Sequence, residues 1–166
     1  MSQLFIVFAA LGSIGALVFA VLMAKRALSV DEGTDLMKKI ASFIRSGAKA
    51  YLHRQYTVVV IFFGCMFLVL CAMAALGFLT WFVPFAFVTG GFFSGLSGYV
   101  GMKIATSSNA RTANACREGL NAGLRVAFSA GTVMGFTVVG LGLFDITAWY
   151  LILRYLMSFD AFAEIS

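Results

Sequence analysis

Four uncharged apolar segments, each about as long as a bilayer is thick, constrain this chain more than any other feature. Their approximate bounds are residues 4–24, 57–82, 84–102 and 126–144. At 1.5 Å per residue, the 21 residues of the first segment reach about 31 Å as a helix, close to the thickness of the hydrocarbon core. Backbone groups in lipid must be paired within the chain, so we predict an all-α integral membrane protein with four transmembrane helices, a single membrane domain over residues 1–166.

Composition excludes the main alternatives to a membrane protein. The chain is 61% apolar and 11% charged, which is more apolar surface than a soluble core of 166 residues can bury. The net charge of +5 would suit nucleic acid, but the basic residues lie beside the spans, so we expect a lipid bilayer as partner and no nucleic acid. Cys65, Cys71 and Cys116 lack the spacing of a zinc site or a disulfide framework.

The lysines and arginines predict the orientation. By the positive-inside rule both basic segments face the cytoplasm, and four spans then place the N- and C-termini outside a multi-pass cell-membrane protein. Of the twelve basic residues, seven lie in the first segment (Lys25, Arg26, Lys38, Lys39, Arg45, Lys49, Arg54), four in the second (Lys103, Arg111, Arg117, Arg125), and Arg154 lies apart.

The first basic segment contains an amphipathic helix between the first and second spans. Apolar residues recur at three- and four-residue steps over residues 36–52, and no proline interrupts the chain from Thr34 to Val83. We therefore expect a cytoplasmic helix that is able to continue into the second span. It either supports a catalytic or gating region or lies on anionic lipid.

Two acidic residues precede this helix at a spacing that is open to two interpretations. Asp31 and Asp35 stand four positions apart and could offer carboxylates to a hard cation such as magnesium. Acidic residues and Thr34 at a helix start also serve as caps and are stabilised by the helix dipole. Capping is the favoured interpretation.

Small residues recur every four positions along the third span and predict close helix packing. They form the rows 90, 94, 98 and 97, 101, 105, and Gly91 and Gly95 form a G-x-x-x-G. On the fourth span, Ala127, Gly131 and Gly135 are expected to face these rows. A phosphate-binding loop is disfavoured because Gly101 is followed by Met102 rather than lysine.

No catalytic, cofactor-binding or metal-binding residue is predicted. His53, the single histidine, has no carboxylate or nucleophile close in sequence and is expected to be an interfacial polar residue. Asp145 lies at the expected outer end of the fourth span, where water reaches it. None of the four helices carries a charged residue at its centre, so the chain lacks the polar groups of a complete ion pathway.

Two stretches resemble the membrane-integral inorganic pyrophosphatases. DEGTDLMKKIASFIRSGAKAYLHRQY, residues 31–56, resembles the first cytoplasmic segment of that family. Residues 91–136, with GYVGMKIATSSNART and VAFSAGTVMGF, resemble its third and fourth helices and the loop between them. The similarity extends over nearly all of residues 31–143.

The resemblance implies a pump that hydrolyses pyrophosphate bound with Mg²⁺ on the cytoplasmic side and drives protons or sodium ions outward. Family members have many more helices and act as homodimers, and their catalytic groups lie on an inner ring of later helices. The first four helices belong to the outer ring. The implied identity is therefore an N-terminal outer-ring fragment of a membrane-bound, ion-translocating pyrophosphatase.

This chain departs from the family in extent. Its tail, residues 154–166, carries none of the aspartate-rich helix ends that hold magnesium pyrophosphate in the family. We therefore expect the isolated chain to be inactive. The alternatives are a small four-helix membrane transporter or accessory subunit, and a scaffold whose glycine-lined faces bind other helices.

Overall fold

The computed structural model describes residues 2–163 of the chain and the side chains of residues 4–155; the last three residues of the tail lie outside this range. Within it the fold is entirely helical and contains no strand. Each helix is long and apolar enough to cross a membrane, which confirms the predicted fold class. The elements are α1 (Ser2–Leu28), α2 (Asp35–Ala75), α3 (Phe82–Ala115) and α4 (Leu120–Ala163).

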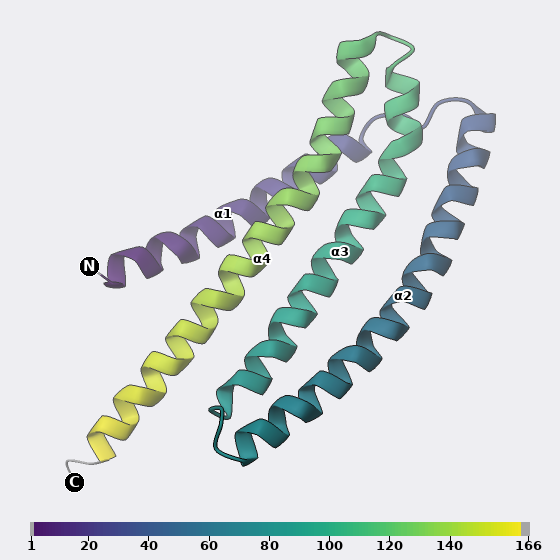
Figure 1. Cartoon of the computed structure of the whole chain (residues 1–166). Helices are drawn as coiled ribbons and strands as arrows, with labels where there is room; N and C mark the ends of the chain where they lie inside the picture. The colour runs from purple at the N-terminus through teal and green to yellow at the C-terminus, as the bar shows by residue number, and fades with distance from the viewer. Residues whose placement is uncertain (1, 164–166) are drawn as a thin grey trace.

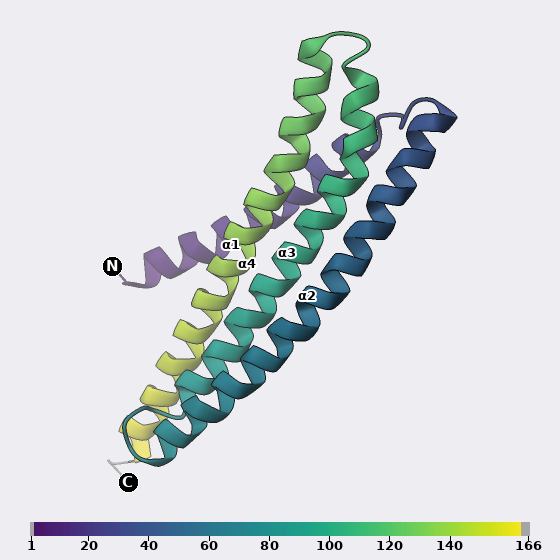
Figure 2. The same ribbon diagram turned by 45° about the vertical axis from the view of Figure 1, so that its right-hand side comes forward.

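The helices do not pack in the order in which they follow one another. Helix α4 lies between α1 and α3, and α2 contacts only α3 within the described residues (Figure 1). Helix α1 crosses α4 obliquely, whereas α2, α3 and α4 run side by side (Figure 2). The α1–α2 and α3–α4 connections lie at one end, and the α2–α3 turn lies at the other (Figure 1). The two basic segments therefore share one end of the molecule.

The amphipathic segment and the second span form one continuous helix. Helix α2 has 41 residues, about 62 Å at 1.5 Å per residue, which is roughly twice the hydrocarbon thickness. The extra length lies at the basic end and carries the polar residues after Asp35. This confirms the expectation that the amphipathic helix continues into the second span.

Helix α2 ends at Ala75, before the end of the apolar run that we had expected to extend to Phe82. Gly77 adopts φ +81°, a conformation that side-chain-bearing residues rarely adopt. The amide of Phe78 donates to the Met73 carbonyl at 3.0 Å, and that of Gly77 to Ala74 at 3.1 Å. This pattern is a Schellman cap. Gly77 therefore ends the helix inside an apolar run, where hydropathy does not indicate a helix end.

The second basic segment, residues 103–125, is mostly helical. It lies outside the spans expected at residues 84–102 and 126–144, but α3 continues to Ala115 and α4 begins at Leu120, which leaves a turn of residues 116–119. The segment has no proline, and alanine, lysine and arginine favour helix there. Hydropathy marks where a helix leaves lipid and gives no information on where it stops.

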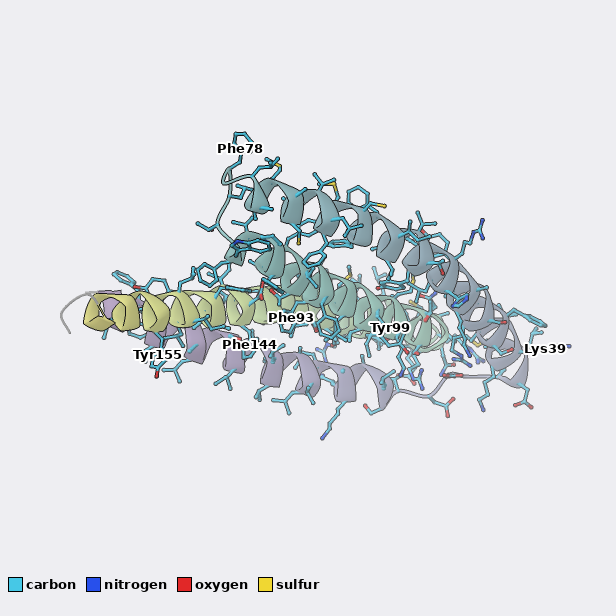
Figure 3. All side chains as sticks on the ribbon, turned by 90° about the horizontal axis from the view of Figure 1, so that it is seen from below. Lys39, Phe78, Phe93, Tyr99, Phe144 and Tyr155 are labelled. Atoms are coloured by element: carbon cyan, nitrogen blue, oxygen red, sulfur yellow. The ribbon has the colours of Figure 1, made fainter. Side chains whose placement is uncertain are left out.

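Helices α3 and α4 pack through a different face of α4 from the one expected. A Cβ on Gly101 would lie 2.8 Å from Met134 Cγ, and the Phe93 and Phe144 rings lie 5.7 Å apart between the helices (Figure 3). A Cβ on Gly131 or Gly135 would meet nothing within 4 Å, so their expected contact with α3 is wrong. The buried residues of α4 follow another helical stripe, at positions 123, 126, 129, 133, 137, 140 and 147.

Helix α1 packs against α4 through small residues and one buried hydrogen bond. Ala16, Ala20 and Ala27 are buried, which allows the two backbones to approach closely. Ser13 Oγ donates to the Gly140 carbonyl at 2.7 Å. A Cβ on Gly140 would lie 2.8 Å from Leu17 Cδ2 and 3.3 Å from the Ser13 carbonyl oxygen. The crossing of α1 and α4 therefore requires glycine at position 140.

Gly140→Ala should destabilise the fold by about 1–3 kcal/mol, because the added methyl group has no space beside α1. Thermal unfolding in detergent measures the effect as a lower midpoint. Gly142→Ala is the matched control, since a Cβ there meets nothing within 4 Å. The control should be neutral or stabilising by about 0.5–1 kcal/mol from helix propensity. Equal midpoints for the two variants would contradict the close approach.

Candidate functional site: a charged clasp at the basic end

A carboxylate in the α1–α2 connection pairs with arginines from two helices. Glu32 Oε1 lies 2.9 Å from Nη1 of Arg45 on α2 and 2.9 Å from Nη1 of Arg111 on α3. Arg45 also donates from Nη2 to Oε2 at 3.4 Å. The Glu32 side chain is only 18% exposed, so these interactions are partly shielded from water. We call Glu32, Arg45 and Arg111 the charged clasp.

Arg111 also binds backbone groups from two segments. Its Nε donates to the carbonyl of Val30 at 2.9 Å, and its Nη1 donates to the carbonyl of Ser107 one turn earlier on α3. Its side chain is 16% exposed. One guanidinium therefore holds the end of α3 to the connection that follows α1, and through Glu32 to α2.

The tight fit of the connection requires glycine at position 33. Gly33 has φ +88°, and a Cβ there would lie 2.7 Å from Met37 Sδ and 2.8 Å from Asn114 Oδ1. The Gly33 amide donates to Asp31 Oδ1 at 2.6 Å. Asn114 Nδ2 reaches the Asp31 carbonyl at 3.4 Å. The connection is thus fixed against the last turn of α3 on both sides of Glu32.

The structure places the acidic residues before α2 as turn and cap residues. Thr34 is the N-cap, and its hydroxyl accepts from the Met37 amide at 3.4 Å. Asp31 accepts from Gly33, and Asp35 lies in the first helical turn, 4.0 Å from Lys38. Among the described side chains, no three histidine, cysteine, aspartate or glutamate residues gather as metal ligands. Asp31 and Asp35 thus act as a turn residue and a first-turn residue at the start of α2.

His53 and Asp145 lie apart from the clasp and from each other. His53 is exposed on α2 and lines a cavity of about 450 Å³ between α2 and α3. Asp145 is half-buried, and its Oδ2 lies 3.5 Å from where a Cβ on Gly90 would stand. Gly90 is about two helical turns inside α3. The structure gives neither side chain a nucleophile as partner within residues 4–155.

The sequence did not point to the clasp. Glu32 is 13 positions from Arg45 and 79 from Arg111, so no local spacing links the three residues. The four-residue spacing of Asp31 and Asp35 indicated those two carboxylates instead. The one available signal was that Glu32 lies within the first basic segment, which was expected on the same side of the membrane as the second.

The clasp can hold helix ends together but has no chemistry for hydrolysis. Its three charged groups are committed to one another and to backbone carbonyls. No nucleophile and general base lie together in it, and it carries a single carboxylate. The fold and this arrangement define a polytopic α-helical membrane protein whose charged end is structurally fixed.

The family within that class is given by comparison with known proteins. Residues 14–165 match the family described as inorganic H⁺ pyrophosphatase, and the chain belongs to that family. This agrees with the resemblance noted at residues 31–56 and 91–136. It also establishes a multi-pass membrane location, together with the four apolar helices.

Three relatives illustrate the similarity. A Bacteroides thetaiotaomicron protein, named as a candidate K(+)-stimulated pyrophosphate-energized sodium pump, is 52% identical over 90% of this chain. The K(+)-insensitive pyrophosphate-energized proton pump 2 of Moorella thermoacetica is 39% identical over 84%. The K(+)-stimulated pyrophosphate-energized sodium pump of Thermotoga maritima is 37% identical over 82%. The chain spans about a fifth of the length of each, between 18% and 20%.

Glu32→Gln should lower stability by about 1–3 kcal/mol, because it leaves two partly buried guanidinium groups without their counter-charge. Thermal unfolding in detergent measures the loss. Glu118→Gln removes one negative charge from an exposed residue of the α3–α4 turn that has no ion pair in the described structure, and it should change little. Equal effects of the two substitutions would show that net charge, and not the clasp, matters.

Proposed function

We propose that this chain is the N-terminal outer-ring part of a pyrophosphate-energised pump, which couples hydrolysis of inorganic pyrophosphate to outward transport of protons or sodium ions. The observation that carries the proposal is the 52% identity to the Bacteroides thetaiotaomicron relative over 90% of this chain. Two of the relatives' printed names specify sodium and one specifies protons, so the proposal includes both ions.

In this proposal the four helices support the pump and perform none of its chemistry. The absence of a carboxylate cluster within residues 4–155 supports a division in which Mg²⁺ and pyrophosphate are bound by other helices of the pump. The clasp would then fix the cytoplasmic ends of α2 and α3 as a rigid wall beside that site. The isolated chain would neither hydrolyse pyrophosphate nor move ions, and the complete pump would act as a homodimer.

A chimera tests this proposal. The Bacteroides thetaiotaomicron relative is expressed with its matching segment replaced by this chain. It should retain Mg²⁺-dependent phosphate release from pyrophosphate, because 52% identity preserves most packing contacts. This chain alone, purified in the same way, should release none.

Glu32→Gln in the chimera is the informative variant. It should lower the thermal stability of the pump more than Glu118→Gln does, since the clasp supports the wall. A chimera that assembles in the membrane as a dimer but lacks hydrolysis would contradict the proposed role. Phosphate release by this chain alone would also contradict it.

We further propose that the basic end faces the cytoplasm and that both termini face outside. Cys116 is exposed in the α3–α4 turn, and Thr80 is exposed in the α2–α3 turn. In a background with Cys65 and Cys71 replaced by alanine, a membrane-impermeant maleimide should label Cys116 only after cells are permeabilised. With Cys116 also replaced by alanine, Thr80→Cys should be labelled in intact cells. The reverse pattern would overturn the orientation.

A further inference from the structure

A groove between α2 and α3 is basic at one end and apolar along the rest. The basic end is a cavity of about 450 Å³ lined by Arg45, Lys49 and His53 from α2 and by Lys103 from α3. No aspartate or glutamate lines it. The three α2 residues follow at four-residue steps and therefore lie on one face of the helix. This end of the groove has a positive potential.

Two lysines of the cavity carry positive charge that no nearby carboxylate neutralises. Arg45 is paired with Glu32 in the clasp. In the part of the chain that the structure describes, neither Lys49 nor Lys103 has a carboxylate within 4.0 Å. Lys103 Nζ lies 5.9 Å from the centre of the ring of Tyr99, which also lines the cavity.

Two tyrosines join the basic end of the groove to its apolar part. Tyr56 and Tyr99 line both the basic cavity and a second cavity of about 450 Å³. The second cavity is enclosed by apolar side chains that include Val60, Phe63 and Leu96. Tyr56 is fixed by donating from its hydroxyl to the Gly95 carbonyl at 2.6 Å. Paired tyrosines between a basic and an apolar region are typical of the membrane interface.

A ligand that matches both parts must carry an anionic group attached to a hydrocarbon chain. We propose that this groove binds an anionic phospholipid, with the phosphate between Lys49 and Lys103 and an acyl chain along Val60, Phe63 and Leu96. A free phosphate would leave the apolar part unused, and a neutral lipid would leave two lysines without counter-charge. Basic pockets between helices on the cytoplasmic side bind such headgroups in other membrane proteins.

Native mass spectrometry of the detergent-purified chain tests the proposal. The chain should retain phosphatidylglycerol in preference to phosphatidylcholine. Lys49→Gln with Lys103→Gln should weaken phosphatidylglycerol binding by about tenfold, since each lysine near a phosphate contributes to affinity. The control, Lys25→Gln with Lys39→Gln, removes the same charge from exposed residues that do not line the cavity and should change binding less than twofold.

Three outcomes would overturn the proposal. Equal loss of binding in both double variants would show a non-specific response to net charge. Displacement of the lipid from the unmodified chain by inorganic phosphate alone would show a simple anion site. Each variant must keep the thermal midpoint of the unmodified chain, which is expected because Lys49 and Lys103 are exposed. Persistence of binding in a variant that keeps its fold also contradicts the proposal.

Discussion

The structure depends on keeping most of its charge at one end and on pairing the partly buried arginines there with a carboxylate. Charged groups are costly in hydrocarbon, so the arginines of two basic segments must meet in the water-exposed ends of α2, α3 and α4. Glu32 is the single carboxylate between Arg45 and Arg111, and it binds both at 2.9 Å. Figure 3 shows that many nitrogen-bearing side chains gather at the end marked by Lys39, whereas Phe78 marks the opposite, apolar turn. These ion pairs hold the helix ends together at the charged end of the molecule, where packing in hydrocarbon is not available.

Away from the basic end, small residues determine the spacing between the helices. Gly140 admits α1, Gly101 admits Met134 of α4, and Gly91 lies so close to Phe63 of α2 that a Cβ there would overlap its ring. Lipid offers no hydrophobic drive for association, so this close packing and the buried Ser13 bond act in its place. The result is a layer of helices that exposes many large apolar side chains.

Hydropathy and charge predicted the helix number, the all-α fold, the continuity of α2 and the gathering of basic residues at one end. They failed where a local backbone effect decided the outcome. The end of α2 depends on the φ of +81° at Gly77, which an apolar run conceals. The face of α4 depends on crossing angles, so Gly131 and Gly135 were assigned to the wrong side. The clasp joins residues 79 positions apart, and Glu32 could be found only once the three-dimensional arrangement was known.

A double-mutant cycle between Glu32 and Arg111 tests the central interaction most directly. The stabilities of the unmodified chain, Glu32→Gln, Arg111→Gln and the double variant are measured by unfolding in the same detergent. If the pair acts as one unit, the double variant loses less than the sum of the single losses, with a coupling of about 1–3 kcal/mol. Additive losses would mean that the two side chains stabilise the protein independently, and the charged clasp would not hold the helix ends together.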